Sequence, residues 1–169
     1  MHRLLALYAC LMATAAFAAD VPPATKTFTD KVAVSNKFEI DTSELALKYG
    51  KSADVKAFAQ KMINDHQKAG ADFKAALVQA SIEPPADSLD VAHTAKYAKL
   101  RLFTTEKGFD AAYVDEQLKA HEDAVATFKD YAANGPTAAV KSFAEKTLPT
   151  LEHHLQMAKS LKSKMPSKD

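Results

Sequence analysis

Hydrophobic residues recur along most of the chain at alternating spacings of three and four, which is the period of an α-helix with one buried face. No stretch alternates hydrophobic and polar residues as a half-buried strand does. The pattern therefore predicts an all-α protein. The expected helices cover residues 28–49, 53–80, 89–105, 109–133 and 136–164.

Glycine and proline mark the ends of these helices. Gly50 is placed to end the first helix, and the segment Asn134-Gly135-Pro136 stops one helix and starts the next. Thr27 and Asp30 resemble a capping box at the start of the first helix. Pro149 lies inside the last helix, where its ring is expected to produce a kink.

The connection between the second and fourth long segments, residues 81–108, is long enough to travel the length of a bundle. One long crossover is the connectivity of ferritin-like bundles, whereas up-down bundles need only short loops. The sequence therefore predicts a ferritin-like four-helix bundle with one long crossover that contains a short extra helix. This single domain is expected over residues 27–165, after a linker at 19–26 and before a tail at 166–169.

The first eighteen residues differ from the rest of the chain. His2 and Arg3 precede the apolar stretch LLALYACLMATAAF, which ends in the small-residue pattern Ala16-Phe17-Ala18. This is the pattern of a secretory signal peptide cleaved after Ala18, and the apolar stretch is shorter than the ~20 residues of a membrane-spanning helix. We therefore expect an exported, periplasmic protein with no transmembrane segment in the mature chain.

Composition narrows the chemistry of the mature chain. The only cysteine, Cys10, lies inside the expected signal peptide, so thiol chemistry is excluded and histidine and carboxylate groups remain as metal ligands. Loss of Arg3 lowers the count of Lys and Arg from 22 to 21, which equals the 21 Asp and Glu. A net charge of zero gives no reason to expect binding to nucleic acid.

Each long helix carries one metal-ligand type of residue on its inward stripe, near the middle of the helix. These residues are Glu39, His66, His121 and His154. The helical rise of ~1.5 Å per residue places the two residues of each antiparallel pair at similar depths. Whether the two pairs of residues lie close to each other depends on the geometry of the crossover, which the sequence does not determine.

Three imidazoles and one carboxylate suit a single transition metal ion, either Zn, Fe, Mn or Cu. A di-metal carboxylate centre is disfavoured because the Glu-x-x-His pairs of such centres are missing. A buried hydrogen-bond network without metal is the alternative. Asp65, Asp110, Tyr113 and Glu122 are candidate partners for the histidine N–H groups. Asp65 and Glu122 each point about 100° away from the adjacent histidine, which also fits a solvated position.

Four stretches, from Phe28 to Leu161, resemble a bacterial family of small exported proteins, domain of unknown function 4142, which is assigned to ferritin-like bundles. They are KFEIDTSELAL, VKAFAQKMINDHQKA, GFDAAYVDEQLKAHEDAVATF and LPTLEHHLQMAKSL. The resemblance implies family positions at Glu39, Asp65, His66, Phe109, Asp110, Tyr113, His121, Pro149 and His154. It supports the fold and export, and it implies no established reaction.

Two functions of different classes follow from these observations. The first is an exported helical-bundle protein of the periplasm or cell envelope that binds one metal ion through the inward His and Glu residues. The second is an interaction module of the envelope in which the same residues are structural. The expected partner is an envelope protein or a small ligand. A hydrolytic enzyme is less favoured, because the spacing shows no Ser-His-Asp or paired-carboxylate arrangement.

Overall fold

The computed structural model describes residues 20–105 and 108–165, and the described residues form helices and loops without strands. The elements are α1 (Pro23–Tyr49), α2 (Ala53–Gln79), α3 (Val91–Leu102), the short 3-10 helix η1 (Phe103–Thr105), α4 (Phe109–Asn134) and α5 (Ala138–Lys164). The predicted all-α fold is confirmed. The expected signal peptide lies outside the described residues. Among the described helices, none is long and apolar enough to cross a membrane.

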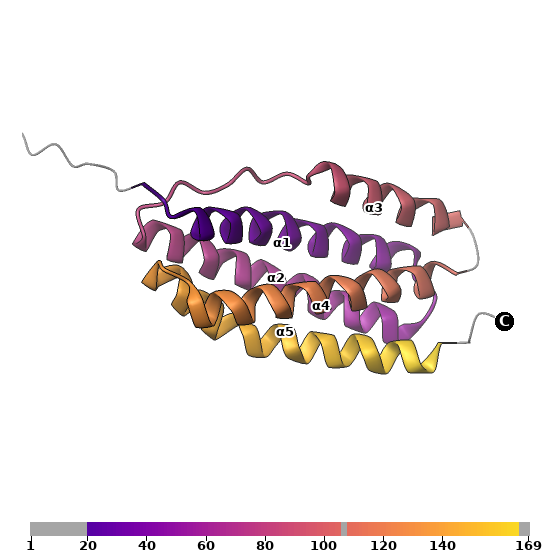
Figure 1. The fold of residues 1–169 in the computed structure, drawn as a ribbon. Coiled ribbons are helices and arrows are strands. Elements are labelled where there is room, and N and C mark those ends of the chain that lie inside the picture. Colours follow the sequence, from indigo (N-terminus) through magenta and orange to yellow (C-terminus); the bar gives the residue numbers. More distant parts are fainter. Residues whose placement is uncertain (1–19, 106–107, 166–169) are drawn as a thin grey trace, which may run out of the picture.

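Two antiparallel hairpins make the bundle (Figure 1). The first hairpin is α1 with α2, and the second is α4 with α5, which form the two most extensive helix pairs. The loop after α2 and then α3 run along α1 from one end of the bundle to the other, so that α2 and α4 point in the same direction. This arrangement is the predicted four-helix bundle with one long crossover and a short extra helix.

Four predicted helix boundaries were wrong. Helix α5 begins at Ala138 with Thr137 as its N-cap, so Pro136 lies before the helix, and α3 ends at Leu102 instead of residue 105. Helix α1 begins at Pro23 instead of residue 28, so the proposed capping box of Thr27 and Asp30 lies within the helix. Proline is suited to a first helical turn, because its missing N–H has no intrahelical partner there. The short helix begins at Val91 instead of residue 89, because the Asp90 side chain accepts a hydrogen bond from the backbone N–H of His93 at 2.7 Å and caps the helix.

Polar side chains tie the two hairpins together at both ends of the bundle. At one end, the hydroxyl of Thr25 forms hydrogen bonds of 2.7 Å with Tyr131 and with Thr137. At the other end, the Asp110 carboxylate accepts hydrogen bonds from the backbone N–H groups of Lys51 and Ser52, the shortest at 2.7 Å. Asp110 belongs to the first turn of α4, so it holds the turn of the first hairpin against the second hairpin.

A buried polar layer divides the hydrophobic core into two clusters. Phe28, Phe73, Leu77, Phe128 and Val140 belong to one cluster, and Val55, Phe58, Met62, Val114 and Leu161 belong to the other. The buried polar side chains between them come from all four long helices and include Glu39, Thr42, His66, Gln117, His121 and His154. The hydrophobic clusters fix the helices on either side of this layer.

Replacement of Asp110 tests the link between the hairpins. Asp110→Ala removes a charged acceptor from two backbone N–H groups, and we expect a loss of about 1–3 kcal/mol in the free energy of unfolding. Urea unfolding followed by circular dichroism measures the change. Asp123→Ala is the control, because the exposed Asp123 has only a 3.9 Å ion pair with Lys119 and should cost less than about 0.5 kcal/mol. Equal stabilities of the two variants would contradict this role.

Candidate metal centre

Three of the four predicted ligands meet in the centre of the bundle. His66 from α2, His121 from α4 and His154 from α5 each offer one ring nitrogen, and these nitrogens all lie within 4.8 Å of one another. The ring centroids are 5.3–5.8 Å apart. All three side chains are buried, with exposed fractions of 7%, 1% and 1%. We call these residues the three-histidine cluster.

One nitrogen of each ring lies within hydrogen-bond distance of an acceptor oxygen outside the cluster. His66 Nδ1 lies 3.2 Å from the side-chain oxygen of Asn36. His121 Nδ1 lies 2.9 Å from the backbone oxygen of Gln117, and His154 Nε2 lies 2.7 Å from Asp65 Oδ2. Because a carbonyl or carboxylate oxygen only accepts hydrogen bonds, each of these ring nitrogens carries the proton.

The tautomers follow from these contacts. A neutral imidazole with its proton on one nitrogen has a lone pair on the other. The remaining nitrogens are His66 Nε2, His121 Nε2 and His154 Nδ1, and all three are buried without a hydrogen-bond partner. Each ring is therefore oriented by an outer acceptor and has a free lone pair, which is the usual arrangement of a metal-binding histidine.

Burial keeps two of the rings neutral. Burial lowers the pKa of His66 well below its ordinary value of 6.5, and His121 and His154 lower it further. Burial also lowers the pKa of His154 to about 4, against the opposing effect of Asp65. At neutral pH both rings are therefore in the deprotonated form that binds metals.

Glu39, the fourth predicted ligand, lies close to the cluster but outside the group of converging nitrogens. Its side chain is only 3% exposed, and its Oε2 has no hydrogen-bond partner. Burial raises the pKa of its carboxyl, while His121 and Gln117 act in the opposite direction. A direct bond from Glu39 to a metal ion stays a prediction.

A pocket of about 500 Å³ reaches the cluster from the surface of the bundle. Glu39, His66 and His121 line its inner part. Exposed residues that line it, Lys31 and Asp90, mark its outer end beside α1 and the start of α3. The pocket therefore brings solvent close to two of the three histidines, whose unpartnered nitrogens stay buried.

The candidate partner residues have different positions. Asp65 is half-buried and contacts His154, and it also forms a 2.8 Å ion pair with Lys61.

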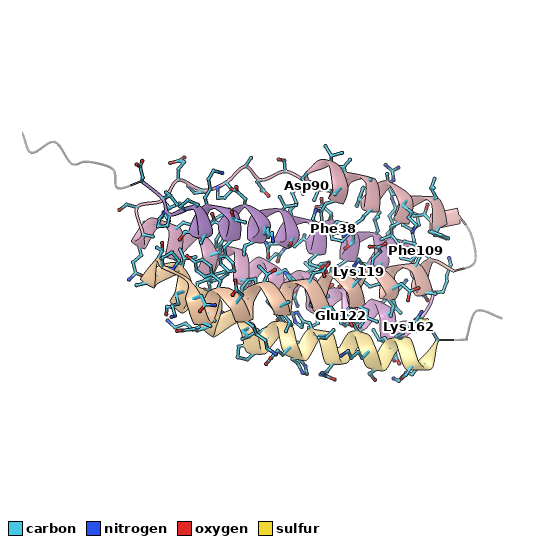
Figure 2. All side chains as sticks on the ribbon, in the orientation of Figure 1. Phe38, Asp90, Phe109, Lys119, Glu122 and Lys162 are labelled. Carbon is cyan, nitrogen blue, oxygen red and sulfur yellow. The ribbon has the colours of Figure 1, made fainter. Side chains whose placement is uncertain are left out.

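The other three candidates have no hydrogen bond to the cluster. The Asp110 carboxylate bonds the turn between α1 and α2, as described above. The hydroxyl of Tyr113 lies 2.8 Å from Ser43 Oγ in the buried core. Glu122 is exposed on α4 (Figure 2). Of the four candidates, only Asp65 has a hydrogen bond to a cluster histidine.

Sequence reasoning missed two residues that orient the rings. Asn36 lies on α1 beside the predicted inward stripe, where a half-buried amide has no hydrophobic signature. Gln117 precedes His121 by one helical turn, so its backbone oxygen is within reach of the ring. The sequence signal for this contact is the spacing of four residues between Gln117 and His121.

The fold and the cluster together define a class of protein: a small four-helix bundle with a long crossover and three converging buried histidines. The chain belongs to the family described as a domain of unknown function, DUF4142, which it matches over residues 10–161. The family predicted from the sequence is thereby confirmed. No curated protein and no solved structure matches the chain.

Stability of the metal-free chain is expected to fall on acidification. His66 and His154 have pKa values below 6.5 in the folded state, so the unfolded chain binds more protons as the pH falls from about 6.5 toward 4. Each contributes a loss of up to about 1.4 kcal/mol per pH unit. Glu39 has a raised pKa and offsets part of this loss, because the folded chain holds its proton to higher pH than the unfolded chain does.

Urea unfolding in the presence of a chelator measures this dependence. We expect a net loss of about 1.4 kcal/mol or more between pH 6 and pH 5. His153→Gln is the matched control, because His153 is an exposed neighbour of His154, and the variant should show the same pH profile. A stability that is constant from pH 7 to pH 5 would show that the buried rings are not held neutral.

Proposed function

We propose that this protein is exported to the cell envelope and binds one transition metal ion through His66, His121 and His154. The observation that carries the proposal is the orientation of the rings. Each ring donates its N–H to an outer acceptor and has its other nitrogen buried and unpartnered. The N-terminal pattern that resembles a signal peptide supports export.

A hydrogen-bond network without metal fits these contacts less well. Each of the three rings directs one N–H outward, and a neutral ring has no second proton with which to link the inner nitrogens to one another. A buried acceptor without a partner costs about 1–3 kcal/mol. One bound cation satisfies all three lone pairs at once, whereas a purely structural role leaves three such costs.

The distances fit an ion after a small movement. A zinc–nitrogen bond of about 2.0–2.1 Å in a tetrahedral site places ligand nitrogens about 3.3 Å apart. The observed separations of up to 4.8 Å require the ring nitrogens to approach one another by at most about 1.5 Å. Three neutral imidazoles favour Zn, Cu or Fe over Mn, which prefers oxygen ligands.

Metal content is the direct test of this function. The chain from residue 19 is purified without a histidine tag, incubated with Zn, Cu, Fe or Mn, desalted and analysed by mass spectrometry. We expect about one ion per chain, and a loss of at least tenfold in affinity in His66→Ala, His121→Ala and His154→Ala, because each variant removes a ligand. His153→Ala is the control and should bind like the wild type, because His153 is not part of the cluster.

The alternative function predicts a different result. A wild-type chain that stays metal-free after all four titrations, with the three variants changed only in stability, would make the histidines structural. The search for function would then move to envelope partners.

Asp65→Asn tests the outer hydrogen bond of His154. The amide no longer supplies a charged acceptor, and we expect metal affinity to fall by about 10–100-fold. Competition with a chromophoric chelator measures the affinity. Asp72→Asn is the matched control, because Asp72 also pairs with a lysine one turn earlier on α2 but lies on the exposed surface. Unchanged affinity in Asp65→Asn would remove Asp65 from the site.

A further inference from the structure

The cluster supplies three ligands to the proposed ion. The nature of a fourth ligand depends on which groups surround the remaining coordination position. A tetrahedral ion with three protein ligands has one remaining position, which a water or another small molecule occupies in reactive sites. The inference below rests on the proposed function, since it concerns that same ion.

The buried polar atoms without a hydrogen-bond partner indicate which groups a fourth ligand would contact. Among the described residues, five buried side-chain nitrogen and oxygen atoms have no hydrogen-bond partner. Three are the inner nitrogens of the cluster, and the other two are Glu39 Oε2 and Gln117 Oε1. A bound cation satisfies the three nitrogens and leaves the two oxygens, which still need a donor.

Those two oxygens belong to the same polar layer as the histidines. Gln117 lies one turn before His121 on α4, and its backbone oxygen accepts the His121 N–H. The Gln117 amide nitrogen lies 3.4 Å from Thr42 Oγ1, and Thr42 follows Glu39 on α1 by three residues. A water molecule on the ion, with two protons to donate, is the smallest group that would satisfy these oxygens.

The pocket lies next to this position. Glu39, His66 and His121 line the pocket, whereas His154 does not, so the cluster is reached from the side of Glu39. Val32, Phe73 and Phe128 also line it. Its volume of about 500 Å³ admits molecules larger than water.

We propose that the ion of the three-histidine cluster keeps one coordination position for an exchangeable small ligand, and that Glu39 accepts a hydrogen bond from a water in this position instead of binding the ion. Water is the resting ligand and donates a hydrogen bond to Glu39 Oε2. Small monoanions such as azide, which bind as single-atom donors, replace the water through the pocket. The ligands of this fourth position are therefore small Lewis bases.

Cobalt(II) substitution followed by azide titration tests this proposal, because the visible spectrum of cobalt reports its coordination. Bound cobalt is first quantified by mass spectrometry. We then expect azide to shift the spectrum of the wild-type protein in a saturable way, with one azide per cobalt. Glu39→Gln should retain about one cobalt per chain and should still respond to azide, because Glu39 is not a ligand in this proposal. Circular dichroism checks that the variant is folded.

Three results would overturn the proposal. If the wild-type spectrum is silent to azide and Glu39→Gln responds, Glu39 occupies the fourth position itself. If both proteins hold cobalt and neither responds, the position is closed. Both results leave the proposed metal-binding function intact. If the folded wild-type chain holds no cobalt and none of the metals named above, the proposed function fails, and this inference fails with it.

Discussion

Three buried imidazoles, each with one ring nitrogen that lacks a hydrogen-bond partner, form the constraint on which the rest of this structure depends. Their N–H groups are all committed to acceptors outside the cluster, so the rings cannot satisfy one another. Buried acceptors without partners are costly, and a protein keeps them where something else supplies the missing interaction. The two hydrophobic clusters on either side stabilise the fold and offset the free energy that this polar layer costs.

The crossover makes this arrangement possible. It brings α4 alongside the first hairpin in the same direction as α2, so the middle of each long helix lies at a common level (Figure 1). It also shapes the access route, because Asp90, His93 and Lys96 at the start of α3 line the pocket that leads to the histidines. The end contacts of Thr25 and Asp110 hold the two hairpins in register around the same level.

Much of the fold could be predicted from hydrophobic spacing alone. The inward stripes placed Glu39, His66, His121 and His154 in the interior, and all four are buried. Their convergence across the two hairpins could not be predicted from the sequence, because it depends on how the crossover positions the second hairpin relative to the first. The start of α1 was missed because Thr27 and Asp30 imitate a cap, whereas Pro23 begins the helix.

The contacts around the rings were harder to predict than the rings themselves. Asp65 looked solvated because it points about 100° away from His66 on the same helix, yet that direction brings it to His154 on α5. Asp110 was an equally plausible partner for a histidine, but it lies at the end of the bundle and bonds the turn between α1 and α2. Asn36 orients His66 from another helix, and a single sequence has no signal for such a pair.

The most direct test of the account is the protonation of the three rings in the metal-free protein. Two-bond proton–nitrogen correlation spectra of the nitrogen-15-labelled chain distinguish the two neutral tautomers and the charged form of each histidine. The account predicts that His66 and His154 are neutral at pH 7. It also predicts a proton on the nitrogen that faces the acceptor in each ring, which is Nδ1 in His66 and His121 and Nε2 in His154. A charged ring of His66 or His154, or a ring of the three without a proton on that nitrogen, would contradict it.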